Sequence, residues 1–66
     1  MQPFQERVIA ERDDLQNKIT KLSVFFGTAT DKSLEKDEQT LLAQQYGHMC
    51  AYATALNLRI AHFKEP

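Results

Sequence analysis

The sequence predicts an all-α protein, an antiparallel two-helix hairpin that assembles into a homo-oligomeric helical bundle. Apolar residues recur at helical spacing in two long stretches, and a short polar stretch separates them. A chain of 66 residues also buries too little surface to stabilise a large core by itself. We expect one domain over residues 1–66, with a helix over 3–26, a loop over 27–34 and a second helix over 35–63.

The first helix is expected to begin at Pro3, because a proline in the first turn lacks only an N–H that has no partner there. Asp14 and Lys18 stand four residues apart with the acid first, which is the favourable order for an ion pair on a helix. Gly27 follows where a left-handed C-cap is expected. The apolar stripe that defines this helix consists of Phe4, Val8, Leu15, Ile19, Leu22, Phe25 and Phe26.

The connection is short and polar, as in antiparallel helix pairs, and the second helix begins near its end. Ser33 is a candidate N-cap, and Glu35, Asp37 and Glu38 favour the positive end of the helix dipole. The stripe of this helix consists of Leu42, Tyr46, Met49, Ala53, Leu56, Ile60 and Phe63. From the two facing stripes we predict the best-buried core residues to be Leu15, Ile19, Leu22, Leu42, Met49 and Leu56.

The second helix contains an uncharged stretch, since Gln39 to Leu58 holds no Asp, Glu, Lys or Arg. An exposed helical face normally carries charge, so this helix is expected to be covered on more than one side. A line of small residues supports that expectation, and its glycine costs roughly 1 kcal/mol relative to alanine, which calls for a packing reason. The predicted subunit interface is Ala43, Gly47, Ala51 and Ala55. The alternative is that the alanines reflect helix propensity alone, which leaves the glycine unexplained.

Composition excludes several classes of protein. Eight basic and nine acidic residues give a net charge of -1, which argues against a nucleic-acid polymer as partner. One cysteine excludes an internal disulfide, and with His48 and His62 it forms no metal-site spacing, so we expect no metal and no cofactor. No signal-peptide pattern opens the chain and no apolar run of about 18 residues occurs, so we expect a cytoplasmic protein.

No nucleophile-and-base pair or phosphate loop appears in the sequence, so we expect no enzyme and no catalytic residue. A different pattern suggests a binding site, because Gln45, Tyr52 and Arg59 recur at intervals of seven along one flank of the second helix. Tyrosine offers a ring for stacking, and arginine offers a planar cation for phosphate. The alternative is a polar seam at the edge of the helix pair, in which Arg59 meets Glu11 or Asp14 of the first helix.

Several stretches carry a resemblance to known proteins: Phe4 to Ile9, Leu15 to Phe26, Glu38 to Leu42, and the pattern Met49, Tyr52, Leu56, Arg59 and Ile60. In these stretches the chain resembles a family of very short bacteriophage and prophage proteins, including those of crAss-like phages, which carry no assigned function. The resemblance spans nearly the whole chain and rests on helix-pattern residues. More loosely, in size, architecture and setting and not in motif, the chain is similar to phage hairpins that act as anti-CBASS or anti-Thoeris sponges, which oligomerise and trap cyclic nucleotide signals.

These resemblances imply a phage counter-defence accessory, an oligomeric hairpin that holds a cyclic di- or trinucleotide between its subunits. The residues expected to bind the ligand are Tyr46, Tyr52 and Arg59, with Lys32 or Thr28 reaching from the loop. The alternatives are a non-enzymatic module that docks on a host or phage protein, such as a host defence protein, and a purely structural bundle subunit.

Overall fold

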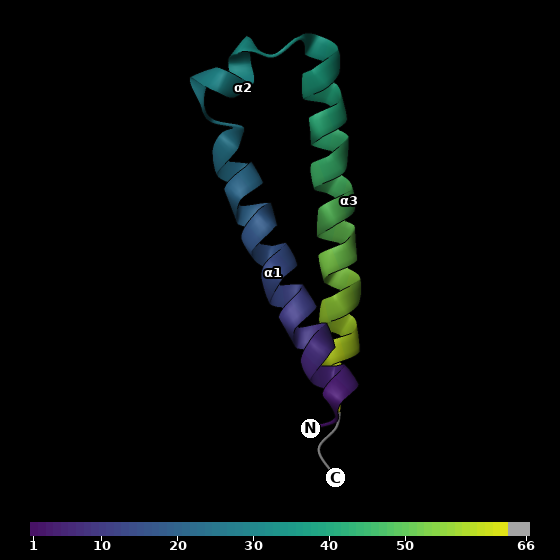
Figure 1. Ribbon diagram of the computed structural model, residues 1–66. Coiled ribbons are helices and arrows are strands. Elements are labelled where there is room, and N and C mark those ends of the chain that lie inside the picture. The colour runs from purple at the N-terminus through teal and green to yellow at the C-terminus, as the bar shows by residue number, and fades with distance from the viewer. Residues whose placement is uncertain (64–66) are drawn as a thin grey trace.

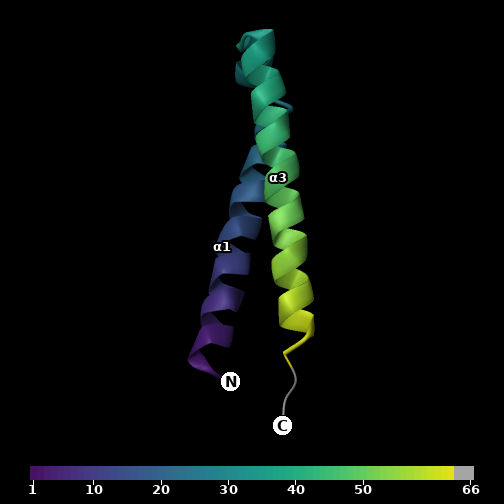
Figure 2. The same cartoon turned by 90° about the vertical axis from the view of Figure 1, so that its right-hand side faces the viewer.

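A computed structural model describes residues 1–63, which form three helices: α1 (Pro3–Phe25), α2 (Ala29–Ser33) and α3 (Lys36–Ala61). No strand occurs within these residues, so the all-α prediction is confirmed. Helices α1 and α3 run in opposite directions and pack along one side of each other, with α2 joining them at one end (Figures 1 and 2). The molecule is therefore long and thin, with extents of 52 × 15 × 14 Å. The last three residues of the predicted domain, 64–66, lie outside the described residues.

Helix α1 begins as predicted, with Pro3 in its first turn and the Gln2 backbone N–H donating to Oε1 of Gln5 at 2.9 Å. Its end differs from the prediction. No described residue has a positive φ, so Gly27 is not a left-handed cap and that prediction is wrong. The chain leaves α1 through a tight right-handed turn, in which the N–H of Gly27 donates to the carbonyl of Val24 at 3.1 Å. This bond closes the helix end without a left-handed residue.

Helix α2 lies inside the predicted loop and was missed by the two-helix prediction. Its start is fixed by Thr28, whose hydroxyl accepts the N–H of Asp31 at 3.2 Å and donates to the carbonyl of Phe25 at 2.7 Å. Ser33 is the last residue of α2 rather than the cap of α3, because its hydroxyl donates back to the carbonyl of Thr30 at 2.7 Å. Glu35 takes the N-cap position of α3, without a side-chain hydrogen bond.

The side chain of Gln39 fastens α2 to α3. Its amide nitrogen donates to the carbonyls of Asp31 at 3.1 Å and Leu34 at 2.9 Å, with a longer contact of 3.4 Å to the carbonyl of Lys32. The carbonyls at the end of a helix have no partner inside it. Gln39 supplies that partner and so determines how the chain turns from α2 into α3.

Replacing Gln39 by alanine is expected to lower the free energy of unfolding by about 1–2 kcal/mol, since a net hydrogen bond contributes about 0.5–1.5 kcal/mol and the freed carbonyls lose their partner. Backbone amides of α2 should exchange faster with solvent in the variant. Gln44→Ala is the matched control, because this exposed glutamine of α3 makes no hydrogen bond through its side chain among residues 1–63. Equal effects of the two substitutions in denaturation and hydrogen exchange would show that the Gln39 contacts do not stabilise the turn.

The core is a narrow strip between α1 and α3. Three of the six residues predicted to be best buried are confirmed, namely Leu15, Ile19 and Leu56, and Leu56 is only 2% exposed. The other three, Leu22, Leu42 and Met49, are only half-buried. Each lies nearer to the α2 end of its helix than the buried residues of the same helix do. Within residues 1–63, the buried residues of the core are Val8, Leu15, Ile19, Ala53 and Leu56.

Aromatic and polar contacts between α1 and the C-terminal part of the chain set the register of the two helices. Phe4 packs edge-to-face against Phe63, with ring centroids 5.9 Å apart. Near the middle, Nη1 of Arg12 donates to Oδ1 of Asn57 at 2.9 Å, while its Nε binds Asp13 at 2.8 Å. Because a long, half-buried side chain reaches its partner only at one relative position of the helices, this bond favours the observed register.

Candidate functional site

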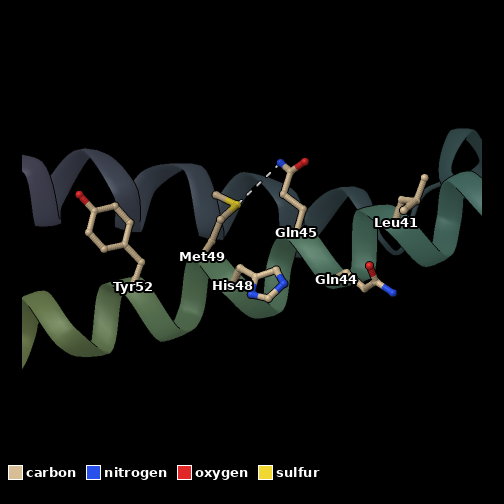
Figure 3. A pocket seen from close by; sticks show the side chains of 6 residues that line it. All are labelled: Leu41, Gln44, Gln45, His48, Met49 and Tyr52. Carbon is tan, nitrogen blue, oxygen red and sulfur yellow. Dashed lines mark hydrogen bonds between the residues drawn. The ribbon is translucent and has the colours of Figure 1, made fainter.

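The first candidate is a groove on the surface of α3, here called the tyrosine groove. It has a volume of about 600 Å³, and its wall is formed by side chains of α3 alone. Figure 3 shows Tyr52 projecting from α3 on the same side as Met49 and Gln45, with α1 passing behind them. The amide of Gln45 lies 3.9 Å from the sulfur of Met49. The residues that line the groove are Leu41, Gln44, Gln45, His48, Met49 and Tyr52.

A second groove adjoins the first and brings in residues of α1. It has a volume of about 380 Å³ and shares Gln45 and Met49 with the tyrosine groove. We call it the lysine groove, because two lysines of α1 lie in its wall. Its α1 residues lie in the second half of that helix, toward α2. Its lining residues are Lys18, Lys21, Leu22, Phe25, Gln45 and Met49.

The two tyrosines of the predicted site take different places. Tyr52 is 46% exposed and lines the tyrosine groove, so its ring is open to a ligand. Tyr46 is half-buried between the helices, where its ring packs edge-to-face on Phe26 with centroids 5.3 Å apart. The charge of the Cys50 thiolate, a hydrogen bond with Cys50 and burial together raise the pKa of the Tyr46 hydroxyl. Tyr46 therefore serves the packing of α3 against α1, and the structure does not bring it into either groove.

The other predicted ligand residues lie at opposite ends of the molecule. Arg59 stands in the last turn of α3, exposed, two helical turns beyond Tyr52 and on the same face. It makes no ion pair within residues 1–63, so the alternative pairing with Glu11 or Asp14 is not seen there. Lys32 is exposed on α2, and the α3 axis separates the two cations by roughly 35 Å. One chain therefore does not bring Lys32 and Arg59 to the same small ligand.

Thr28 has a structural task that occupies its hydroxyl group. The hydroxyl donates to the carbonyl of Phe25 at 2.7 Å and accepts the N–H of Asp31 at 3.2 Å. A hydroxyl has one hydrogen to donate, and here that hydrogen is already used. A ligand would have to compete with the start of α2 for this group.

The four residues of the predicted subunit interface, Ala43, Gly47, Ala51 and Ala55, are all exposed in the single chain. A Cβ placed on Gly47 would meet no atom within 4 Å beyond the adjacent turns of its own helix, so no contact within residues 1–63 requires a glycine at this position. The same outer face of α3 carries Leu58, which is 67% exposed. We call this surface the outer face of α3.

The lysine groove is not among the sites predicted from the sequence. Lys18 and Lys21 are three residues apart on α1 and therefore share a face, and they flank the apolar stripe next to Leu22. That spacing was the available signal, but it acquires meaning only when α3 is placed beside it. Among residues 1–63, no three side chains of His, Cys, Asp or Glu come together to hold a metal ion. Within the same residues, no helix has both the length and the apolar character of a membrane span.

Two comparisons with known proteins match almost the whole chain. The family described as Sequestin matches residues 2–62. A protein of Enterobacteria phage T4, described as an uncharacterized 7.5 kDa protein in the denB-rIIB intergenic region, is 42% identical over 64 residues, which is 97% of this chain and 100% of that protein. The resemblance to small phage proteins is thereby confirmed. No solved structure matches the chain significantly.

Proposed function

Because this chain belongs to the Sequestin family, we propose that it is a non-enzymatic sponge, which binds a small anionic signal of the host and withholds it. The family name denotes sequestration, and the T4 relative is a phage protein, so both agree with a phage counter-defence accessory acting in the host cytoplasm. The observation that carries the proposal is the open groove beside the exposed Tyr52, on a helix segment without charged residues. An aromatic ring at the rim of such a groove is suited to stacking on a nucleobase.

We further propose that the sponge is a homo-oligomer assembled through the outer face of α3. That face combines small side chains with the exposed Leu58, and no residue between Gln39 and Leu58 carries a formal charge. A second helix approaches closely where small residues recur every four positions. A neighbouring subunit on this face would also stand beside the tyrosine groove and deepen it, since both surfaces belong to α3.

The ligand class expected for the sponge is a cyclic di- or trinucleotide, and the first test is thermal stability. A ligand that binds only the native protein stabilises it by about 2.7 kcal/mol at about 100 times its Kd. For a domain of this size, each kcal/mol raises Tm by about 4–8 °C. We expect one member of a panel of cyclic nucleotides and cyclic ADP-ribose isomers to give such a shift. Native mass spectrometry of the same sample should show the subunit count and the bound ligand together.

Tyr52→Ala is expected to abolish the shift in Tm without changing the oligomer, because this side chain is exposed and supports no core contact. Tyr46→Phe is the matched control, since Tyr46 packs between the helices and its hydroxyl faces Cys50 rather than a groove. A shift that survives Tyr52→Ala would retain the sponge and remove the tyrosine groove as its site. The absence of any shift across the whole panel would remove the sponge.

The second candidate function is a module that docks on a host defence protein without binding a small ligand. The observation that favours it is the amount of apolar side chain left open on α3, where Leu41 is 58% and Leu58 is 67% exposed. Such a surface is also suited to a protein partner. A protein that is monomeric, inert toward the nucleotide panel and able to inhibit a purified defence protein directly would favour this function over the sponge.

A further inference from the structure

We propose that Lys18 and Lys21 of α1 form the phosphate-binding end of the ligand site, and that the base of the ligand lies at Tyr52 of α3. This inference rests on the proposed function and specifies how the site recognises its ligand. It replaces Lys32 of α2 as a source of positive charge and assigns a role to α1. The ligand class that it requires is a phosphorylated compound that also carries an aromatic base.

The geometry that supports the inference is the continuity of the two grooves. Gln45 and Met49 line both of them, so a ligand crosses from one to the other without leaving the surface. Lys18 and Lys21 line the lysine groove, and Tyr52 lines the tyrosine groove. The combined groove thus has a cationic part on α1 and an aromatic part on α3, joined by an amide and a thioether.

The charged groups around the lysine groove leave the region of Lys18 and Lys21 with a net positive charge. Lys21 is exposed and has no carboxylate oxygen within 4.0 Å in the part of the chain that the structure describes. Lys18 contacts Asp14 at 3.3 Å, but both side chains are more than 60% exposed, so a phosphate oxygen in the groove competes with this weak pair. The opposite wall adds no negative charge, because α3 has no acidic residue from Gln39 to Leu58. A local positive field therefore exists in a chain whose net charge is -1.

The chemistry of the two lysines and of Tyr52 determines which ligand the groove can bind. Lysine ammonium groups bind phosphate as point charges, and two of them on one helix face suit a phosphate group or a phosphodiester. The exposed ring of Tyr52 offers a stacking surface for a base. Inorganic phosphate satisfies only the lysines, and an uncharged nucleoside satisfies only the tyrosine. Neither alone should bind as well as a molecule that carries both.

Isothermal titration of the full chain tests the inference with four probes: cyclic di-AMP, cyclic ADP-ribose, adenosine and inorganic phosphate. We expect at least one of the two cyclic nucleotides to bind, and adenosine and phosphate to bind far more weakly. Lys21→Gln should weaken binding of that nucleotide about tenfold or more, as loss of a charge-assisted hydrogen bond does, and should reduce its dependence on salt. Lys21→Arg keeps the positive charge and should retain most of the affinity.

Lys32→Gln is the matched control, because it removes the same charge from an exposed lysine that lies outside both grooves. It should leave the affinity unchanged. Because Lys21 is exposed, neither Lys21→Gln nor Lys21→Arg should alter the helical circular dichroism of the protein. A second, independent measurement is the nuclear magnetic resonance spectrum with the bound nucleotide, in which the amides of Lys18, Lys21 and Tyr52 should shift and that of Lys32 should not.

The outcomes separate this inference from the proposed function. Wild-type protein that binds a cyclic nucleotide, with an affinity that Lys21→Gln leaves unchanged, retains the sponge and overturns the lysine groove as its phosphate site. Loss of binding in Lys32→Gln instead would assign the phosphate to α2. Wild-type protein that binds neither cyclic nucleotide overturns the proposed function, and the inference is overturned with it.

Discussion

Replacing Leu56 by alanine is expected to lower the free energy of unfolding by about 2–5 kcal/mol, the usual range for a fully buried leucine. Leu56 is 2% exposed and belongs to the cluster of buried side chains that forms the core between α1 and α3. A domain this small has little stability to lose, so the variant should be largely unfolded at physiological temperature. Urea denaturation followed by circular dichroism measures the change, with the wild-type protein and the variant at the same concentration.

Leu41→Ala is the matched control, because it removes the same atoms from the same helix at a side chain that is 58% exposed. Its effect should stay within about 0.5 kcal/mol, as is usual for surface substitutions. A loss below about 1 kcal/mol for Leu56→Ala would show that α3 packs on a different face. Equal and large losses for both variants would show that another surface covers the groove side of α3.

Replacing Gly47 by glutamate is expected to convert the proposed homo-oligomer into monomers. Within residues 1–63, no atom beyond the adjacent turns of α3 lies within 4 Å of the new Cβ, so the substitution should not disturb the fold of the single chain. In a contact between subunits, however, the side chain would separate two closely packed helices and bury an unpaired charge, which costs several kcal/mol. Sedimentation velocity at micromolar concentration should show the change in mass.

Ala10→Glu is the control for the added charge, because Ala10 is an exposed alanine of α1 away from the outer face of α3. Gly47→Ala separates the two interpretations of the glycine. On a face open to water, alanine should stabilise the helix by about 0.8–1.0 kcal/mol. On a face that another helix approaches closely, the added methyl group should weaken association instead. Wild-type protein that sediments as a monomer, or a stabilised Gly47→Ala, would contradict the interface.

The two long helices could be predicted because their sequence signals are local and repeated. The apolar period predicted a helix over 3–26 where α1 occupies Pro3–Phe25, and a helix over 35–63 where α3 occupies Lys36–Ala61. The Asp14–Lys18 pair also forms, at 3.3 Å, because helical geometry alone brings the two residues together. Long periodic segments determine their own conformation, and the neighbouring elements change only their ends.

The features that the sequence did not reveal depend on contacts between elements. Helix α2 has five residues, too few for an apolar period, and it depends on Thr28 at its start and on Gln39 from α3 at its end. The uneven burial of the core depends on how α1 and α3 lie against each other, which no periodicity encodes. Leu22 and Leu56 occupy equivalent places in their stripes, yet only Leu56 is fully covered.

The candidate site was predicted only in part, because some of its residues come together only when two helices pack. The spacing of Gln45, Tyr52 and Arg59 placed them on one flank of a helix, and two of the three do line the tyrosine groove. Tyr46 lies on the side of α3 that packs against α1. The periodicity of a single helix does not distinguish that side from the flank next to it. The lysines of α1 enter the site only through the packing of two helices, so one-helix patterns could not indicate them.

The uneven core has a consequence for how the chain folds. The buried residues lie away from the α2 turn and are far apart in the sequence. Val8 and Leu56, for example, are 48 positions apart. Residues next to the turn are close in sequence but only half-buried. The short loops that lose the least entropy on closing therefore give the weakest contacts. Zippering from the turn therefore meets no stable intermediate, and folding should be all-or-none. In the folded chain, we expect the α2 end to open first, and the lysines of the lysine groove lie in the half of α1 next to it.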